Sequence, residues 1–454
     1  MAAIATAPGL GGVGLVRVSG PRALHIARVL TGRHPEPRRA LHAPFKDATG
    51  DVLDDGIVLV FAGPRSFTGE DVAEFQGHGG PVVLRLVLDA VLAAGARLAR
   101  AGEFTERAFL NGKLDLAQAE AVADLIASGS AAAARGAVRS LQGVFSRAVN
   151  QINEHVLGLR VFVEAALDFP DEAVEFLASG QVAAQTQTIA DELNRLISDT
   201  RQGVLLRDGV VIALVGAPNV GKSSLLNRLA QQDRAIVSEV PGTTRDTIDV
   251  ELVLDGLPCH VVDTAGIRAS EDVIEREGMR RSAEQASRAD IVLVLEDARD
   301  AQSWSRSVAR GWLAEQALAA DPKRVIRVLN KVDLLGHSML ARGSLVDTSD
   351  DAPDTVAISA LNGTGVSDLI RSVHAKAGFM GEAGTYTART RHVLALRRAA
   401  DALGAAQTLL RAEADPELIA EELRHVHGHL GDIVGTLSAD DLLGEIFSRF
   451  CIGK

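Results

Sequence analysis

The pattern of apolar and polar residues differs between three regions of this chain. In the first 112 residues the apolar runs are short and bounded by glycines, which is typical of strands joined by turns. Residues 11–18 and 56–61 are predicted strands, residues 77–80 (Gly-His-Gly-Gly) a turn, and residues 82–98 a helix. Together these elements predict a compact α/β unit.

From residue 113 onward, apolar residues recur at the helical period instead. This pattern runs from residue 114 to about residue 169, breaks at Phe-Pro-Asp-Glu (169–172) and resumes over residues 182–201. It returns near the C-terminus over residues 389–412, 416–430 and 439–450. We expect these helices to form a bundle.

Between the helical stretches, apolar strands end in short polar motifs, which indicates a parallel sheet with helices on its faces. The predicted fold class is therefore multidomain, α/β plus all-α. Residues 1–112 form an N-terminal α/β domain, and residues 113–206 with 376–454 form one helical domain. Residues 207–375 are a Ras-like P-loop domain inserted into the helical one.

The first strand of the inserted domain, residues 211–215, runs into a G-x-x-x-x-G-K-S motif at residues 216–223, and a helix follows. Strand, glycine-rich loop and helix in this order are a P-loop, in which backbone N–H groups and a helix N-terminus hold phosphate oxygens. We expect Lys222 to reach the β- and γ-phosphates and the Ser223 hydroxyl to bind Mg²⁺.

Three further motifs follow strands of the same domain. Asp263-Thr264-Ala265-Gly266 is expected at the magnesium ion and the γ-phosphate. In Asn330-Lys331-Val332-Asp333, the Asp333 carboxylate can accept hydrogen bonds from N1–H and the 2-amino group of guanine, donors that adenine lacks. A backbone N–H of Ser359-Ala360 can meet guanine O6. The motifs together predict GTP as the ligand.

The segment Gly242-Thr243-Thr244-Arg245-Asp246 lies between the P-loop helix and the Asp263 motif. Thr244 fits a magnesium ligand that responds to the γ-phosphate. Ile267 stands where Ras-like proteins carry the glutamine that orients the attacking water. Another group must orient the water, and spacing leaves four acids open: Glu271, Asp272, Glu275 and Glu277.

Composition and charge limit the kinds of site, partner and cellular compartment that we expect for this protein. The chain has 454 residues, a net charge of −12 and two cysteines, which gives no disulfide framework and no thiolate cluster. Cys259 lies within a strand and is expected in the core. A negative protein has no general attraction for nucleic acid, so RNA contact would need a local basic patch or a partner. Without a signal sequence or an apolar run that could span a membrane, we expect a cytoplasmic protein.

Two sets of polar residues allow more than one interpretation. Arg17 and Glu74 lie among apolar residues, and composition alone favours pairing of one with the other. His425, His427 and His429 follow one another on a late helix, where residues 425 and 429 share a face. A partly exposed helix face is the simpler explanation of the histidines, and metal binding is the alternative.

Nearly the whole chain resembles one family, the tRNA-modification GTPases MnmE (TrmE). The three most specific segments are Gly242–Asp246, the sequence GEFTERAFLNGKLD at residues 102–115, and the C-terminal Phe450-Cys451-Ile452-Gly453-Lys454. The order of the domains is also that of the family.

For the nucleotide domain, the resemblance implies a potassium ion bound by Asn219 and by oxygen atoms of Ser238, Val240 and Thr243. This ion would supply the charge that an arginine finger gives in other GTPases. The resemblance also assigns the orientation of water to Glu275. The full set of residues expected around GTP is Asn219, Val220, Gly221, Lys222, Ser223, Ser224, Ser238, Glu239, Val240, Pro241, Gly242, Thr243, Thr244, Asp263, Thr264, Ala265, Gly266, Asn330, Lys331, Asp333, Ser359 and Ala360.

For the N-terminal domain, the resemblance implies dimerisation and binding of 5-formyl- or 5,10-methylenetetrahydrofolate. Arg17, Glu74, Lys113 and Lys454 would be the folate ligands. A carboxylate can pair with the donors of a pterin, and Arg or Lys with the glutamate carboxylates of folate. Cys451 matches a cysteine that the family requires, and an inert thiol in a packed tail is the alternative.

The resemblance thus implies a K⁺-dependent GTPase with Lys222, Glu275 and Cys451 as catalytic residues. It would act as a homodimer with an FAD-containing partner resembling MnmG, in a heterotetramer or larger complex. Together they would add a carboxymethylaminomethyl or aminomethyl group to C5 of the wobble uridine (U34) of certain tRNAs. Two alternatives remain: a ribosome-assembly GTPase of the Era or Der kind, and a self-associating G-domain scaffold.

Overall fold

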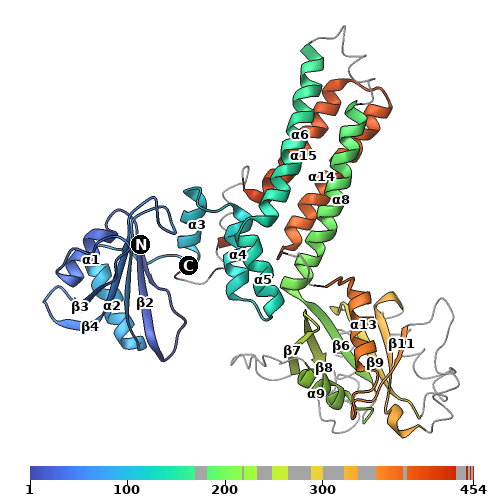
Figure 1. Cartoon of the computed structure of the whole chain (residues 1–454), viewed down its shortest axis with the longest axis horizontal. Coiled ribbons are helices and arrows are strands. Elements are labelled where there is room, and N and C mark those ends of the chain that lie inside the picture. Colours follow the sequence, from blue (N-terminus) through green and yellow to red (C-terminus); the bar gives the residue numbers. More distant parts are fainter. Residues whose placement is uncertain are drawn as a thin grey trace, which may run out of the picture. The chain divides into compact units, whose positions relative to one another are not determined.

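A computed structural model of the chain divides it into two compact units. One comprises Met1–Ala127, Ala137–Ile197 and Arg391–Lys454, and the other Ser128–Gly136 and Ser198–Thr390. The described residues are 1–168, 181–216, 219–232, 248–263, 288–299, 322–335, 354–381 and 386–435, together with 446, 447, 450 and 453. Figure 1 labels the elements named below.

Five antiparallel strands form the N-terminal sheet, in the order β1-β2-β5-β4-β3. They are β1 (Ala2–Ile4), β2 (Gly11–Ser19), β3 (Leu41–Lys46), β4 (Val52–Phe61) and β5 (Val72–Gly79). Helices α1 (Ala23–Thr31) and α2 (Pro81–Ala93) cover one face, where Phe45 and Phe75 pack with Ile26 and Val87 (Figure 1). Since successive side chains of a strand point to opposite faces of the sheet, the residues between these core residues lie on the face away from α1 and α2.

The predicted turn at residues 77–80 is wrong. Gly77 to Gly79 are the end of β5, and Gly80 is the N-cap of α2. A Cβ atom on Gly79 would lie 2.5 Å from the carbonyl oxygen of Gly11 on β2, so these glycines allow two strands to approach closely. The strands predicted at 11–18 and 56–61 are confirmed as parts of β2 and β4, and the helix predicted at 82–98 ends earlier, at Ala93.

Helices make up the middle and the end of the chain. They are α3 (Glu103–Leu110), α4 (Leu116–Ile126), α5 (Ala131–Leu141), α6 (Val144–Asp168), α8 (Gln181–Asp208), α14 (Thr390–Arg411) and α15 (Pro416–Val434). Buried residues of α6 include Val149, Ile152, Val156, Leu159 and Val163. Their alternating spacing of three and four is that of helices packed in a bundle, and α6 packs against α15. Helices are thus present in both parts of the chain where they were predicted, and the bounds of the helical domain stay a prediction.

A buried ion cluster joins three of these helices. The Glu120 carboxylate of α4 accepts two hydrogen bonds of 2.8 Å from Arg391 and lies 2.9 Å from His392 Nε2, both on α14. Arg391 also donates to the carbonyl oxygens of Asp432 and Ile433 in the last turn of α15. Burial alone would raise the pKa of Glu120, but the nearby His392 and Arg391 outweigh it and lower that pKa. The cluster therefore holds the helices together as a charged, fully bonded group.

Six strands form the sheet of the nucleotide domain, in the order β11-β10-β9-β6-β8-β7. They are β6 (Val210–Gly216), β7 (Ile248–Leu254), β8 (Leu257–Asp263), β9 (Ile291–Asp297), β10 (Val325–Asn330) and β11 (Asp354–Ala357). All pairings are parallel except that of β7 with β8. Helices α9 (Lys222–Gln232) and α13 (Val366–Ala377) pack on one face. This is the predicted parallel sheet.

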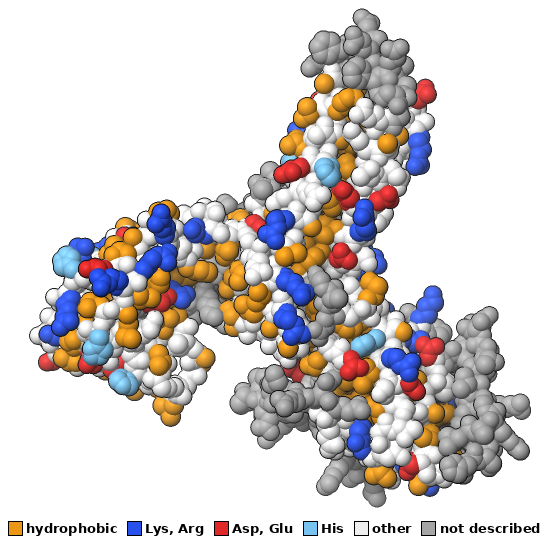
Figure 2. All heavy atoms as spheres, in the orientation of Figure 1, with side chains coloured by type: hydrophobic (Ala, Val, Ile, Leu, Met, Phe, Trp, Pro, Cys, Tyr) orange, Lys and Arg blue, Asp and Glu red, His pale blue; other side chains and the backbone are white. Residues whose placement is uncertain are grey.

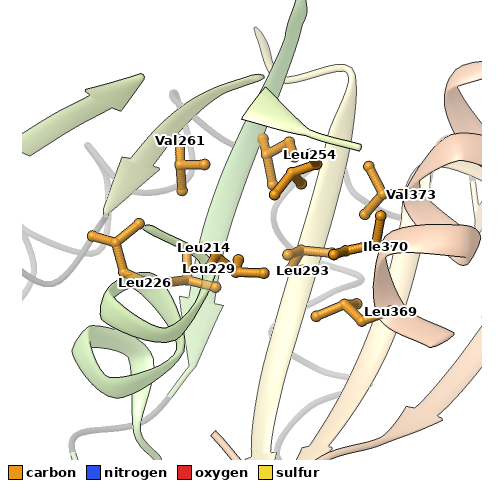
Figure 3. Close-up of a pocket in the computed structure, with 10 residues that line it drawn as sticks. Leu214, Leu226, Leu229, Leu254, Val261, Leu293, Leu369, Ile370 and Val373 are labelled. Carbon is orange, nitrogen blue, oxygen red and sulfur yellow. The ribbon is translucent and has the colours of Figure 1, made fainter. Parts of the chain in front are cut away.

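A small cavity of about 10 Å³ lies between this face and its helices (Figure 3). Its lining is entirely aliphatic, including Leu214 of β6, Leu229 of α9 and Ile370 of α13. Such a gap offers nothing to a phosphate or a base, so it belongs to the core. Cys259 is also in this core, where burial raises the pKa of its thiol to about 12, as expected for an inert cysteine. Among the described helices, none is both long and apolar enough to cross a membrane.

Candidate functional sites

The P-loop of the nucleotide domain lies between the end of β6 and the start of α9. Lys222 is only 8% exposed, and its ammonium group donates a hydrogen bond of 2.6 Å to the carbonyl oxygen of Gly216. The lysine is thus folded back over the loop, where phosphates bind in this motif. Gly221 has a φ of +103°, and a Cβ atom there would collide with the side-chain amide of Asn330. Glycine is therefore required at this position.

Asn330 joins the P-loop to the two base-recognition motifs. Its side-chain amide donates to the carbonyl oxygen of Val220 (2.8 Å), and its side-chain oxygen accepts from the backbone N–H of Ala360 (3.0 Å). The side chain is almost fully buried, so both ends of the amide need these partners. Asn330 therefore connects its own motif to a P-loop 110 positions earlier and to a segment 30 positions later in the sequence.

The side chains expected to hold guanine lie around this junction. Ser359 Oγ donates to Asp333 Oδ1 at 2.5 Å, which fixes the orientation of the carboxylate. Lys331 donates to the carbonyl oxygen of Asn219 at 2.7 Å. The structure thus brings the predicted P-loop, N-K-x-D and Ser-Ala residues together at one edge of the sheet.

Two residues of this site were missed by sequence reasoning. Arg228 of α9 donates to the carbonyl oxygens of Ala360 (3.0 Å) and Leu361, and so holds the Ser359-Ala360 segment in place. Asp297, the last residue of β9, lies 2.9 Å from the Lys331 ammonium group. Asp297 follows a buried apolar strand just as Asp263 does, and this signal was present in the sequence.

Magnesium ligands were predicted at Ser223 and Thr244, with Asp263 nearby. Ser223 is exposed in the first turn of α9, and Asp263 is the last residue of β8, paired in register with Leu214. The exposed Ser223 hydroxyl at the start of α9 is an oxygen ligand of the kind that a hard divalent cation prefers, and the backbone of Asp263 ends the strand next to β6. The part of the site that the structure describes therefore fits Mg²⁺.

Several predicted site residues lie outside the described residues. They are Ser238, Glu239, Val240, Pro241, Gly242, Thr243, Thr244, Thr264, Ala265, Gly266, Glu275, Cys451 and Lys454, and Ile267 lies there too. Ser224 is described and exposed on the first turn of α9.

A second polar site lies on the N-terminal sheet, on the face opposite α1 and α2. Arg17 of β2 and Glu74 of β5 are directly paired in the ladder, and Arg17 Nε donates to Glu74 Oε1 at 2.8 Å. Their side chains are 21% and 14% exposed. The guanidinium carbon lies 5.8 Å from the ring centre of Phe104 and 6.0 Å from that of Phe67. An ion pair flanked by aromatic rings on an open sheet face is suited to a flat polar ligand.

Lys113 borders the loop of residues 64–69 beside this pair. Its ammonium group donates to the carbonyl oxygen of Pro64 at 3.1 Å, and Asn111 donates to that of Thr68 at 2.7 Å. Of the four predicted folate ligands, Arg17 and Glu74 are in contact, and Lys113 holds the loop that carries Phe67.

The segment at residues 102–115 positions this site. Glu103 of α3 is 2% exposed and is bonded by Arg97 (2.5 and 2.8 Å), Arg107 (2.8 Å) and the backbone N–H of Arg100 (2.9 Å). Arg107 also donates a hydrogen bond of 2.7 Å to the Glu70 carboxylate. Burial alone would raise the pKa of Glu103, but these hydrogen bonds outweigh it and lower the pKa to about 2. The network fixes α3, and with it Phe104 beside Arg17.

The same segment also seats the end of the chain. Gly102 has a φ of +67°, and a Cβ atom there would lie 2.5 Å from the carbonyl oxygen of Phe447 and 3.0 Å from Cβ of Phe450. Phe447 and Phe450 pack with Leu116 of α4. Gly453 has a φ of +101°, and its Cβ position is blocked by the carbonyl oxygen of Ile4 on β1. Glycine at 102 and at 453 therefore lets the C-terminal segment pack against the N-terminal domain.

The histidines of α15 lie beside acids. His425 is 3.4 Å from Glu421 and 3.6 Å from Glu422, and His429 is 3.9 Å from Asp432. Within the described part of the chain, no group of three or more His, Cys, Asp or Glu residues is arranged to hold a metal ion.

Two family models match this chain. The model described as "GTP-binding protein TrmE N-terminus" matches residues 1–113, and the one described as "MnmE helical domain" matches residues 116–451. The chain belongs to the MnmE family. The first match ends within the segment at residues 102–115 that carries the polar network, and the second begins directly after it, at residue 116.

MnmE proteins of several bacteria are similar to the chain over its whole length. "tRNA modification GTPase MnmE" of Pseudomonas syringae pv. tomato is 49% identical, over 100% of this chain and 98% of the relative. The proteins of the same name from Stutzerimonas stutzeri and Azoarcus sp. are 48% and 51% identical over the same shares. Family and geometry agree that this MnmE chain is a GTP hydrolase.

Proposed function

We propose that this chain is a K⁺-activated GTPase that modifies tRNA together with a flavoprotein resembling MnmG. The pair would add a carboxymethylaminomethyl or aminomethyl group to C5 of the wobble uridine (U34) of certain tRNAs, with methylenetetrahydrofolate as the one-carbon donor. The observation that carries the proposal is the presence, in one chain of this family, of a joined guanine-nucleotide site and a separate charged site on an open sheet face.

The nucleotide site supports GTP rather than ATP. Asp333 keeps one carboxylate oxygen on Ser359, so that its other oxygen can accept from guanine. Adenine has no donor for this carboxylate, so the site would lose the hydrogen bonds that it makes with guanine. Lys222 would bind the phosphates, Ser223 and Thr244 the magnesium ion, and Glu275 would orient the attacking water.

Potassium is proposed at Asn219, with Ser238, Val240 and Thr243 completing the site. Asn219 adopts a φ of +64°, rare for a residue other than glycine, and Lys331 holds its carbonyl oxygen at 2.7 Å. The side chain of Asn219 is exposed at the mouth of the loop. A monovalent cation there would neutralise charge between the phosphates, which is the role of an arginine finger in other GTPases.

GTP hydrolysis at saturating Mg²⁺ should be slow in NaCl and at least about tenfold faster in KCl of equal ionic strength. Asn219→Ala should remove the response to K⁺ while the slow rate in Na⁺ persists. Gln231→Ala, on the exposed end of α9, is the matched control and should respond to K⁺ like the wild type. Equal wild-type rates in the two salts would exclude potassium activation.

Folate is proposed on the open face of the N-terminal sheet. The Glu74 carboxylate could exchange its bond to Arg17 for the paired donors of a pterin ring, and Phe67 and Phe104 lie beside it. Arg17, Lys113 and Lys454 would then be cationic partners for the glutamate carboxylates. Residues 1–113 carry 13 Lys and Arg against 11 Asp and Glu, whereas the rest of the chain carries 34 against 48. The anionic folate is thus proposed to bind within residues 1–113, which carry less negative charge than the rest of the chain.

Arg17→Ala should weaken binding of 5-formyltetrahydrofolate, measured by isothermal titration calorimetry, by about tenfold or more. The matched control is Arg85→Ala, since Arg85 pairs with Asp89 on the exposed side of α2, away from this face. Unchanged affinity in Arg17→Ala would count against the site. Loss of affinity in both variants would show that the effect is general.

Homodimerisation is proposed through the N-terminal domain. Leu10 is 93% exposed and Val13 67%, and on the adjoining helix Val82 is 71% exposed and Leu86 45%. Gly14 of β2 lies against the buried Leu84 of α2, so the two elements that carry these exposed residues pack together. Figure 2 shows apolar side chains on the surface of this domain. An exposed apolar surface of this kind favours association with a second copy. The substrate tRNA places the work of the complex in the cytoplasm.

A further inference from the structure

Asp297 is a buried acid next to the guanine site that the proposed function leaves without a role. It ends β9, in register with Asn330 of β10, and is 8% exposed. Its Oδ2 atom accepts a hydrogen bond of 2.9 Å from the Lys331 ammonium group. Arg299 binds both oxygens of the same carboxylate, at 2.9 and 2.6 Å. These hydrogen bonds, with that of Arg299 the strongest influence, lower the pKa of Asp297, so the group is ionised at neutral pH.

Lys331 lies between this carboxylate and the P-loop. Its ammonium group donates 2.9 Å to Asp297 and 2.7 Å to the carbonyl oxygen of Asn219. A carboxylate, an ammonium group and a carbonyl thus form a continuous chain from β9 to the loop. Both ends of the Lys331–Asn219 bond have left-handed backbones, with φ of 66° and 64°. Such conformations persist in residues other than glycine where the surroundings hold them.

The two partners of Asp297 have different roles in this arrangement. Arg299 comes from the same turn, two residues on, and its own backbone N–H also bonds the carboxylate. Lys331 directly follows the neighbouring strand β10 and reaches the acid across the end of the sheet. Without the acid, Lys331 would keep the carbonyl of Asn219 as its described acceptor, and its long side chain would regain rotamers.

We infer that Asp297 is a positioning residue, which holds the Lys331 side chain against the P-loop and thereby strengthens guanine-nucleotide binding. The inference rests on the guanine site proposed above and adds a residue from β9 to it. Lys331 belongs to the binding motif, and Asp297 acts on the nucleotide only through that lysine. Removal of the charge at residue 297 should therefore matter only when Lys331 is present.

The test is a double-mutant cycle on the full-length protein, with binding and dissociation of a fluorescent GDP analogue measured by stopped flow. Asp297→Asn should weaken binding by about tenfold, mainly through faster dissociation. In a Lys331→Met background, the same change should have little further effect. The matched control is Glu296→Gln: Glu296 is the neighbouring acid on β9, bonded at 2.8 and 3.0 Å to Arg327 instead of Lys331, and its loss should leave affinity near wild type.

An equal loss of affinity from Asp297→Asn with and without Lys331 would overturn the inference, as would an unchanged affinity in the single variant. In either case, wild-type binding of the GDP analogue would leave the guanine site itself intact. Failure of the wild type to bind would instead count against the proposed function. If Asp297→Asn does not fold, the double variant Asp297→Asn/Arg299→Gln removes both members of the local pair, leaves no unpaired guanidinium there and enters the same cycle.

Discussion

Single side chains with two bonding ends hold the nucleotide site together. Asn330 bonds the P-loop with its amide group and the Ser359-Ala360 segment with its oxygen. Asp333 bonds Ser359 in the same region. Because the Asn330 side chain is buried, loss of one of its partners leaves an unpaired polar atom, which costs more than the bond itself contributes. Nucleotide selection in this chain is therefore sensitive to changes of single atoms.

Asp333→Asn tests this sensitivity. The asparagine amide donates a hydrogen bond where the carboxylate accepted one. The 2-amino group of guanine therefore loses its acceptor, while the C2 carbonyl oxygen of xanthine gains a donor. Hydrolysis of GTP should fall at least about a hundredfold, and the preference should shift towards XTP. Asp354→Asn, whose carboxylate is 60% exposed and pairs with Lys376, is the control and should keep GTP preference. A preference for GTP retained by Asp333→Asn would contradict the assignment.

At the scale of elements, α3 connects the N-terminal sheet to the C-terminal segment. Glu103 and Arg107 fix it to Arg97 and Glu70, which precede it in the chain, and Gly102 accommodates Phe447 and Phe450. This short helix carries Phe104 to Arg17. The segment at residues 102–115 is one of those by which the family is recognised, and the structure gives a physical reason. Nearly every polar side chain in this segment forms a hydrogen bond with another part of the same compact unit.

Acid should weaken this connection in a defined pH range. The pKa of Glu103 is about 2 in the folded chain against an ordinary value of 4.5, so its stabilisation is present above pH 4.5 and is lost as the pH falls towards 2. This lowering of the Glu103 pKa, by about 2.5, corresponds to at most about 3 kcal/mol of unfolding free energy. Thermal unfolding followed by circular dichroism should show Glu103→Gln melting below wild type at pH 7, with a gap that narrows below pH 4.

Glu106→Gln is the control for this measurement. Glu106 is on the same helix but pairs with Arg100, whose side chain is 69% exposed, so its loss should change the melting temperature little. A gap between Glu103→Gln and wild type that stays constant or widens in acid would contradict the account.

Much of the fold could be predicted because patterns repeat within each element. The spacing of three and four along α6 and the apolar strands of the nucleotide domain carry their own signal. The end of β5 was taken for a turn because glycines permit both a turn and a close approach of strands. Arg228 could not be predicted because it acts from the middle of a helix without a motif, and only the three-dimensional arrangement brings it to the site; Asp297 had a signal in the sequence, its place after an apolar strand, but its partner Lys331 is known only from the structure.

At the scale of the whole molecule, two candidate sites lie in two different compact units. The guanine-nucleotide site belongs to the unit containing residues 198–390, and the Arg17–Glu74 site to the unit containing residues 1–127. The first unit has the motifs of a GTP hydrolase, and the second offers a charged, aromatic-lined face of a kind that a switch GTPase alone does not require. This division supports a protein in which nucleotide hydrolysis serves chemistry at another site.

The most direct test of this account is mass spectrometry of tRNA nucleosides from a strain that lacks the gene. Carboxymethylaminomethyl- and aminomethyl-uridine at the wobble position should disappear, return with the wild-type gene, and stay absent with Arg17→Ala or Asp333→Asn. Wobble uridines that remain fully modified in the deletion strain would contradict the account and favour a GTPase switch without modification chemistry.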